Sequence, residues 1–286
     1  MNRKGSKGGK LHGVLAGLLP ALSTPIIPCP MDSRPSAESS RQAKAGLRAV
    51  LVTGASGGIG QAISRGFGKA GWCVGIHYHR EKHAAESTLH DVQDAGGSGL
   101  LYEADVRDAQ AVQQLVAAFI RDHTPPVCFV CCAGVGSAKL LLKLSPDEWA
   151  EVMATNLTGT FHSLRAMAPA LLAQGGGSIV VLGSRAGSQG SRGQAAYAAS
   201  KAGLIGLVKT AAVEWGPDNI RVNLVLPGWQ HTRLTAETMP SGQQWKDHAL
   251  GRPPALEEVV RTVMHLVKLK DVSGQVWNCD SRSLSA

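Results

Sequence analysis

The chain has 286 residues, of which 44% are hydrophobic and 17% charged, so it is long enough to bury a sizeable core in one large α/β domain or two small ones. Its formal net charge is +8, but residues 1–44 hold seven Lys and Arg against Asp32 and Glu38 and therefore carry +5 of it. The remaining +3 is modest, and no basic cluster is interleaved with aromatic residues, which argues against the nucleic-acid-binding classes.

Residues 1–44 are predicted to be a leader and flexible linker, separate from a domain at 45–286. A basic start precedes an apolar stretch at 11–28 and a Ser- and Pro-rich segment, a composition found in secretory signals and organelle transit peptides. Prolines at 20, 25 and 28 argue against a spanning helix. Met31 is a further candidate for the true start. We expect no membrane span and a cytoplasmic location, or an organelle matrix if the leader is a transit peptide.

The cysteines and histidines do not suggest a metal site. The six cysteines fall mostly in apolar runs, which is typical of buried reduced thiols. The ten histidines are scattered, and the densest group, His77, His79 and His83, does not make a convincing ligand set. We therefore predict no metal.

From residue 47 onward, short apolar runs alternate with longer helical patterns, which predicts parallel strands joined by crossover helices. Ser145-Pro146-Asp147-Glu148 is a capping box with proline at the first helical position, so a helix starts there. The predicted fold class is α/β, a single Rossmann-type doubly wound parallel sheet of about seven strands with helices on both faces. The expected strands are 48–53, 73–78, 99–103, 127–132, 178–184, 220–225 and 274–278, and the expected helices lie near 58–70, 81–95, 108–121, 146–173, 194–215 and 255–268.

A glycine-rich turn, TGASGGIG, follows the first predicted strand and leads into an amphipathic helix pattern. Gly54, Gly58 and Gly60 would let the backbone approach a pyrophosphate, and the N-terminus of the following helix favours negative charge. The turn therefore predicts dinucleotide binding, with Ser56 and Ile59 in the same site.

The end of the second strand, VGIHYHRE, indicates which dinucleotide is bound. NAD-binding sheets of this kind usually place a carboxylate there for the ribose 2′-hydroxyl, whereas a basic group accommodates a 2′-phosphate. Tyr78 occupies this position and Arg80 follows. We therefore predict NADPH/NADP as the cofactor, with both residues at its site. The alternative is that Arg80 is a solvated charge at a helix start.

Tyr197 and Lys201 are four residues apart in AAYAASKAG, so both project from one face of a helix. The ammonium group is expected to favour the ionised phenol, which can then exchange a proton near neutral pH. Ser184 ends the apolar run SIVVLGS, where its hydroxyl could hold a substrate oxygen. The three residues predict a proton-transfer site for a carbonyl or an alcohol.

The chain carries the glycine turn, then Ser184, then the Tyr–Lys pair. With motifs in this order, residues 46–280 resemble the classical short-chain dehydrogenase/reductases, and most of all the 3-oxoacyl-acyl-carrier-protein reductases. The resemblance adds Asn156, in ATNLTGTF, as the residue that holds a water linking Lys201 to solvent. Asn156, Ser184, Tyr197 and Lys201 then complete the family's catalytic tetrad.

The resemblance also implies the residues around the nucleotide. Asp105 and Val106 would bind the adenine, although Asp105 precedes a helix and could cap it instead. Cys131-Cys132-Ala133-Gly134 stands where the family has Asn-Asn-Ala-Gly. Ala133 and Gly134 would line the nucleotide, while the two thiols are weak hydrogen-bonding groups and put the bracing of this strand in doubt.

A loop at 227–232, PGWQHT, resembles the family's P-G-x-x-x-T loop, which orients the nicotinamide carboxamide. Gly228 and Thr232 are therefore expected to bind the cofactor. Trp229 and Gln194 are expected to face the substrate.

Together these residues predict the reduction of a ketone by NADPH, with Tyr197 as proton donor. Ser184 would hold the oxygen, and Lys201 would tune the phenol and bind the nicotinamide ribose. The resemblance implies a 3-oxoacyl thioester on acyl carrier protein, in fatty-acid synthesis. A coenzyme A thioester, a small ketone or secondary alcohol, and a non-catalytic nucleotide-binding scaffold are the alternatives. Gly175 and Asp218 stand where such reductases carry arginines for the acidic carrier, which predicts weaker docking.

The helix pattern from Gln194 to Glu214 is apolar or small nearly all round, with Lys201 and Lys209 as the charges over its first twenty positions. One face covers the sheet, so another needs burial elsewhere. The family buries this face between subunits, which implies a homotetramer or homodimer. The tail Asp280-Ser281-Arg282 departs from the family's Asp-Gly-Gly and puts the C-terminal contact in doubt.

Overall fold

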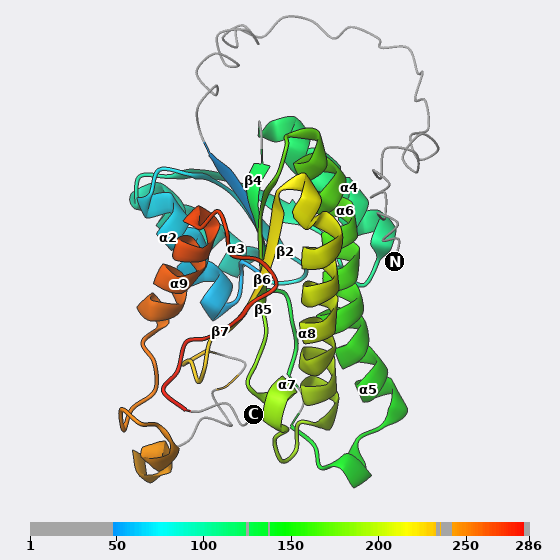
Figure 1. The fold of residues 1–286 in the computed structure, drawn as a ribbon, viewed down its shortest axis with the longest axis vertical. Helices are drawn as coiled ribbons and strands as arrows, with labels where there is room; N and C mark the ends of the chain where they lie inside the picture. Colours follow the sequence, from blue (N-terminus) through cyan, green and yellow to red (C-terminus); the bar gives the residue numbers. More distant parts are fainter. Residues whose placement is uncertain (1–47, 124–125, 137, 233–234, 236–241, 283–286) are drawn as a thin grey trace, which may run out of the picture. The chain divides into compact units, whose positions relative to one another are not determined.

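Seven parallel strands form a single sheet in the order β3-β2-β1-β4-β5-β6-β7, and Figure 1 shows helices on either side of these strands. The computed structural model describes residues 48–123, 126–136, 138–232, 235 and 242–282, all within the unit Arg41–Ala286; the predicted leader lies outside them. The predicted doubly wound α/β sheet is confirmed, and each expected strand is present to within two residues at either end. The strands are β1 (Ala49–Thr53), β2 (Cys73–Tyr78), β3 (Ser98–Glu103), β4 (Pro126–Cys131), β5 (Gly177–Leu182), β6 (Ile220–Leu226) and β7 (Val276–Asn278).

The chain switches direction across the sheet at β1. It runs outward from β1 to β2 and β3, then returns to the other side of β1 at β4 and continues to β7. Open α/β sheets bind ligands at such a switch point, outside the carboxyl ends of the strands. Thr53 ends β1 and Cys131 ends β4, and the two residues are partners in the parallel register. The glycine turn after Thr53 therefore begins at the switch point.

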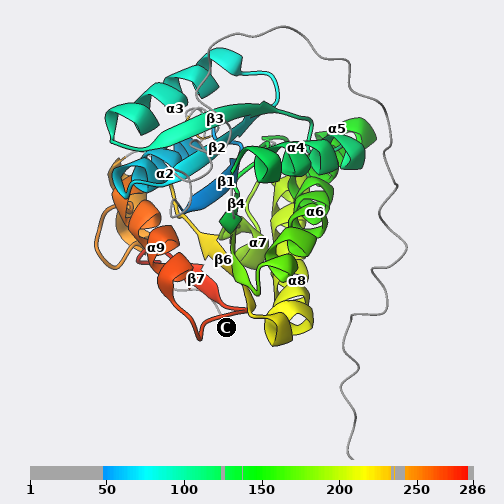
Figure 2. The ribbon, with the colours of Figure 1, turned by 90° about the horizontal axis from the view of Figure 1, so that it is seen from above.

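Helices cover both faces of the sheet (Figure 2). One layer contains α2 (Gly58–Lys69), α3 (Lys82–Asp94) and α9 (Leu256–Lys268), and the other contains α4 (Ala109–Asp122), α6 (Gly159–Ala173) and α8 (Ala195–Trp215). The buried side chains form two cores accordingly, with Phe67 in the first and Phe119 in the second. Because both faces are covered, the strands are apolar almost throughout.

The helix expected at 146–173 is interrupted. It starts with α5 (Pro146–Met153), passes through a π-helical turn (Ala154–Thr158) and continues as α6. The capping box at its start is confirmed, because Glu148 N donates to Ser145 Oγ at 3.2 Å and Ser145 N donates to Glu148 Oε2 at 3.0 Å. Four short helical segments were not expected, namely α7 (Ala186–Gln189) and 3-10 turns at Leu141–Lys143, Gly216–Asp218 and Gly242–Asp247.

The cysteines within the described residues are all free; Cys128 and Cys131 are buried, as predicted, whereas Cys73, Cys132 and Cys279 are only partly buried. Cys128 and Cys131 have the C-x-x-C spacing of many disulfide and metal motifs, but residues three apart on a strand point to opposite faces. Cys128 accordingly belongs to the core beneath α2 and α9, and Cys131 to the core beneath α4, α6 and α8. Across the described residues there is no group of three or more His, Cys, Asp and Glu that could hold a metal ion.

Over the described ranges, no helix combines the length and the apolar character needed to cross a membrane.

Candidate active site

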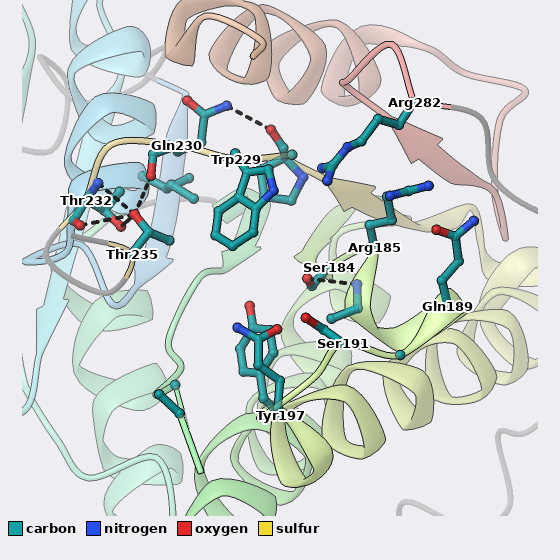
Figure 3. Close-up of a pocket in the computed structure, with 18 residues that line it drawn as sticks. Ser184, Arg185, Gln189, Ser191, Tyr197, Trp229, Gln230, Thr232, Thr235 and Arg282 are labelled. Atoms are coloured by element: carbon teal, nitrogen blue, oxygen red, sulfur yellow. Dashed lines mark hydrogen bonds between the residues drawn. The ribbon is translucent and has the colours of Figure 1, made fainter. Parts of the chain in front are cut away.

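A cavity of about 430 Å³ opens at the carboxyl ends of the strands, beside α8 (Figure 3). Its walls come from segments far apart in the chain: the start of α2, the loops after β4, β5 and β6, and the segment after β7. Figure 3 shows Ser184, Tyr197 and Trp229 around the same space. The predicted site residues that line the cavity are Ile59, Ser184, Gln194, Tyr197, Gly228, Trp229 and Thr232.

Ser184 and Tyr197 meet at this cavity. Ser184 follows β5, and its Oγ accepts a hydrogen bond from Ala186 N at 3.2 Å, where the chain turns into α7. Tyr197 lies in the first turn of α8. Burial raises the pKa of the Tyr197 phenol, and a hydrogen bond with Ser184 opposes this rise. The phenol therefore keeps its proton at neutral pH, while the hydrogen bond with Ser184 favours its ionised form.

Lys201 lies one turn further along α8 and is buried, with 6% of its surface exposed. Its Nζ donates to the carbonyl oxygen of Leu182 at 2.8 Å and lies 5.7 Å from the centre of the Tyr197 ring. Burial lowers the Lys201 pKa to about 8, so the ammonium form still predominates at pH 7. The sequence predicted that Lys201 would favour the phenolate, but burial has the larger effect on the Tyr197 pKa.

Asn156 sits in the π-helical turn between α5 and α6. Its Oδ1 accepts from Val135 N at 2.8 Å, and its Nδ2 donates to Val135 O and to Ser200 Oγ, each at 3.0 Å. Ser200 Oγ in turn donates to the carbonyl oxygen of Tyr197 at 2.8 Å. The asparagine therefore ties the loop after β4 to the first turns of α8. Sequence reasoning missed Ser200, although it directly precedes Lys201 in the same motif.

Gly134 brings these elements into contact. A Cβ at this position would lie 3.1 Å from Asn156 Oδ1 and 3.7 Å from Lys201 Nζ. Asn156 and Lys201 therefore both approach the bare backbone after β4, so the structure brings the predicted tetrad into one neighbourhood.

The glycine turn leaves room for a ligand against its backbone. Gly54 has a φ of +66°, and a Cβ there would lie 2.7 Å from the Ala133 Cα. A Cβ on Gly58 would lie 2.9 Å from Thr232 Cγ2, so the turn and the 227–232 loop meet directly. Among the described residues, no side chain caps the start of α2, so its first N–H groups can bind an anion. The residues present therefore fit a dinucleotide pyrophosphate.

His77 supports this turn and was not assigned a role from the sequence. It is buried on β2, with 2% of its surface exposed. Nδ1 accepts from Gly54 N at 3.0 Å, and Nε2 lies 3.1 Å from the carbonyl oxygen of Ala104, to which it donates. Burial, as the largest effect, lowers the His77 pKa to about 4. A neutral imidazole therefore joins the ends of β1, β2 and β3 beneath the predicted cofactor site.

At the outer end of the predicted cofactor site, Tyr78 donates from its hydroxyl to Glu103 Oε2 at 3.1 Å, and Arg80 is exposed after β2. Asp105 accepts two side-chain hydrogen bonds from Arg107 Nε, at 2.9 and 3.0 Å, and this guanidinium is the main reason that the Asp105 pKa falls to about 2. Asp105 is not the helix cap, contrary to the alternative kept open above.

That cap is Asp108, whose carboxylate accepts from the N–H groups of Gln110 and Ala111 at the start of α4. Val106, between the two aspartates, is buried, and Gly159 at the start of α6 lies close to its side chain.

Thr53 supplies the bracing that the cysteines at 131 and 132 put in doubt. Cys132 N donates to the Thr53 carbonyl oxygen at 3.1 Å and lies 3.2 Å from Thr53 Oγ1. Ala133 N lies 3.4 Å from the same hydroxyl. Burial raises the pKa of the Cys132 thiol to about 12, so this thiol stays protonated and the strand end is held by the threonine instead.

The 227–232 loop is held in place by its own side chains. Gln230 Nε2 donates to the Pro227 carbonyl oxygen at 2.8 Å, and Thr232 N donates to Thr235 Oγ1 at 3.1 Å. Gly228 has a φ of +69°, and a Cβ there would lie 2.8 Å from the Asp280 Cβ. The loop therefore packs against the segment after β7, where the chain departs from the family's ending.

The chain matches the family described as short chain dehydrogenase over residues 48–242. It belongs to this family. Its fold is also that of solved relatives: it superimposes on a variant of actinorhodin polyketide ketoreductase solved with NADPH with a TM-score of 0.75 and 30% identity, covering 82% of this chain and 96% of that one. A putative short-chain alcohol dehydrogenase from Sinorhizobium meliloti gives a TM-score of 0.78 at 27% identity, with 82% and 95% covered.

Two kinds of enzyme are similar in sequence. The 3-oxoacyl-acyl-carrier-protein reductases of Staphylococcus epidermidis and Synechocystis sp. are 32% and 34% identical, each covering 80% of this chain and 95% and 94% of the relative. Human (3R)-3-hydroxyacyl-CoA dehydrogenase is 41% identical over 65% of this chain and 74% of its own length. The protein is therefore an oxidoreductase that acts on CH–OH or ketone groups, in a family that binds NAD or NADP.

Proposed function

We propose that this enzyme reduces the ketone of a 3-oxoacyl thioester to a secondary alcohol with NADPH. The observation that carries the proposal is the contact between Ser184 and Tyr197 at a cavity that Ile59 of the glycine turn and Thr232 also line. A proton donor, an oxygen-binding hydroxyl and the predicted cofactor loops thus face one space.

Each residue of the site has a role that follows from its position. Tyr197 is protonated at neutral pH and donates its proton to the substrate oxygen, while Ser184 holds that oxygen in place. Lys201 supplies a buried positive charge one helical turn away, where it favours the developing phenolate and binds the nicotinamide ribose. Asn156 fixes the loop around Gly134 and holds a water that returns the proton. NADPH, when bound, supplies the hydride.

The preference for NADPH rests on the end of β2. Tyr78 stands where NAD-binding sheets place a carboxylate, and its hydroxyl is engaged with Glu103 on the neighbouring strand. Arg80, two residues on, is exposed to meet a 2′-phosphate. Asp105 offers an acceptor for the adenine amino group beside Arg107.

The carrier of the acyl group is proposed from the relatives. The bacterial and cyanobacterial 3-oxoacyl-acyl-carrier-protein reductases match over nearly their full length, which favours an acyl-carrier-protein thioester in fatty-acid synthesis. The higher identity to a human hydroxyacyl-CoA dehydrogenase favours a coenzyme A thioester as the second candidate.

The absence of arginine at Gly175 and Asp218 does not decide between the two carriers. Gly175 precedes β5 and Asp218 precedes β6, and both lie near Asn219, whose side chain donates to the Gly175 carbonyl oxygen. These are the amino ends of the strands, whereas the cavity lies at their carboxyl ends. Neither position flanks the cavity of its own subunit.

The direct test is an assay with acetoacetyl thioesters. We expect NADPH oxidation with acetoacetyl-acyl carrier protein at a higher kcat/KM than with acetoacetyl-CoA. A higher value with acetoacetyl-CoA would support the second candidate, and no turnover of either thioester would contradict the proposed substrate class.

A homotetramer is proposed from the surface of α8. This helix exposes the small or apolar residues Ala202, Gly206 and Val213, and 78% of the Val213 surface is accessible; Lys209, Thr210 and Glu214 are exposed beside them. A row of small and apolar residues exposed on a long helix is a typical subunit contact.

A further inference from the structure

The cavity wall beyond Ser184 carries two guanidinium groups. Arg185 follows Ser184 directly, and Arg282 comes from the segment after β7; both line the cavity. Figure 3 shows the two side chains on the side of the cavity away from Thr232. Reduction of a neutral ketone by Tyr197 uses neither of them.

Arg282 is held in place by a buried acid. Its Nε donates to Asp280 Oδ2 at 2.9 Å, and its terminal nitrogen also contacts this oxygen. The Asp280 side chain has no exposed surface, and the Arg282 side chain is 13% exposed. The carboxylate therefore compensates one positive charge from behind the wall, and the guanidinium is fixed at its surface.

Arg185 adds a second charge to the same wall. Burial is the main effect that lowers its pKa, and the neighbouring Arg282 lowers it further, while Asp280 and the exposed Asp247 oppose the change. The guanidinium nevertheless stays charged, because arginine does not lose its proton in proteins. Among the described residues that line the cavity there is no Asp or Glu. The wall beyond Ser184 is thus positive, with the polar side chains of Gln189 and Ser191 beside it.

We infer that Arg185 and Arg282 form a binding site for an oxyanion carried by the ketone substrate; the inference rests on the proposed reduction of a ketone. Guanidinium groups bind carboxylate and phosphate oxygens with paired, charge-assisted hydrogen bonds. Because Arg185 adjoins the serine that holds the reacting oxygen, a carboxylate bound there lies near the ketone, as in a short keto acid. The phosphate of a phosphopantetheine arm is the second source of the same chemistry; it lies far from the ketone along the arm and reaches the arginines only if the arm folds back.

The test compares matched substrates that differ by the anion. Acetoacetate and methyl acetoacetate differ by a carboxylate near the ketone, and acetoacetyl-phosphopantetheine and acetoacetyl-pantetheine differ by a remote phosphate. Arg185→Gln removes the charge, and Arg185→Lys keeps it. Arg192→Gln is the control, because Arg192 is exposed and is not among the residues that line the cavity.

We expect the unaltered enzyme to prefer acetoacetate to its methyl ester in kcat/KM. Arg185→Gln should lower this preference about 10- to 100-fold, mostly through KM, since a hydrogen bond to a charged group is lost. Arg185→Lys should restore part of the preference, and Arg192→Gln should leave it unchanged. If only the phosphopantetheine pair showed this pattern, the anion would be the carrier's phosphate.

Two results would overturn the inference while leaving ketone reduction intact. One is that the unaltered enzyme uses the charged and the neutral substrate of each pair equally well; the other is that Arg185→Gln does not alter its preference for the charged substrate. If none of the four ketones is reduced, the proposed function fails, and calorimetric titration with acetoacetate decides the site. Binding weakened by Arg185→Gln but not by Arg192→Gln supports it. Absence of binding, or equal binding by all three proteins, overturns it.

Discussion

At the scale of single residues, burial dominates the ionisation of the proposed catalytic pair, Tyr197 and Lys201. It raises the pKa of Tyr197 and lowers that of Lys201 to about 8. At pH 7 the phenol therefore carries its proton and the amine its charge, which are the forms that ketone reduction requires. The sequence identified both residues and Ser184 because their chemistry follows from residue type and spacing. It could not weigh burial against charge, since burial depends on the packing of α8 on the sheet.

The Lys201 pKa predicts the alkaline limit of the reaction. Its folded-state value of about 8 lies below the ordinary value of 10.5, so the ammonium charge is present below pH 8 and is lost as the pH rises through it. We expect kcat for ketone reduction at saturating NADPH to fall tenfold per pH unit above about pH 8. A kcat that stays constant from neutral pH to well above pH 8 would contradict this role of Lys201.

The proposed preference for NADPH also depends on a single residue. Arg80→Ala should raise the Michaelis constant for NADPH about 10-fold, because one charge-assisted hydrogen bond is lost. The Michaelis constant for NADH should change little. Lys69→Ala is the matched control, because this exposed lysine ends α2, at the opposite end of the helix from the glycine turn. Equal use of both cofactors by the unaltered enzyme would refute the argument from the end of β2.

At the scale of elements, the sequence predicted each strand and each long helix, because hydrophobic periodicity and the capping box at Ser145 encode them. It missed the π-helical turn that carries Asn156. The extra residue per turn is a backbone adjustment that leaves no pattern of its own. The role of His77 was missed for a related reason: the imidazole joins the ends of three strands, and only the folded sheet brings them together.

The buried imidazole predicts acid sensitivity. The His77 pKa falls from 6.5 to about 4 on folding, so the unfolded state takes up the proton first and stability is lost as the pH falls from 6.5 toward 4. Between pH 7 and pH 4.5 this should cost about 2 kcal/mol of unfolding free energy. His77→Asn keeps an acceptor for Gly54 N but has no group that titrates. Urea unfolding should therefore show that this variant loses less unfolding free energy between pH 7 and pH 4.5 than the unaltered protein.

His83→Asn is the control for this experiment, because His83 is fully exposed. It should lose as much stability on acidification as the unaltered protein. The same acid-induced loss in His77→Asn would show that another group is responsible.

At the scale of the whole molecule, the alternation of short apolar runs with helical patterns predicted the doubly wound sheet. The two arginines on the cavity wall were not predicted. Arg282 reaches it from the ending Asp280-Ser281-Arg282, where it forms an ion pair with Asp280 beside Gly228. The sequence marks this segment as unusual, because it departs from the family's Asp-Gly-Gly. It does not show which residues the segment contacts, since these contacts form only in the folded chain.

The proposed assembly depends on the outer face of α8. Val213→Glu would place a charge on this face, so we expect the tetramer to dissociate into smaller species at fixed protein concentration, measured by sedimentation velocity. Leu250→Glu, at a leucine that is 66% exposed and lies outside α8, should leave the assembly unchanged. A tetramer that survives Val213→Glu would place the subunit contact elsewhere, and a monomeric unaltered protein would refute the proposal.

The central claim is that Tyr197 donates the proton in ketone reduction. Its most direct test is the single-turnover rate with bound NADPH for the unaltered enzyme and for Tyr197→Phe, together with NADPH affinity measured by fluorescence. The substitution removes the transferable proton and little else, so the rate should fall by a factor of ~10²–10⁴ while NADPH binding stays nearly intact. Retention of more than about a hundredth of the rate would contradict the claim.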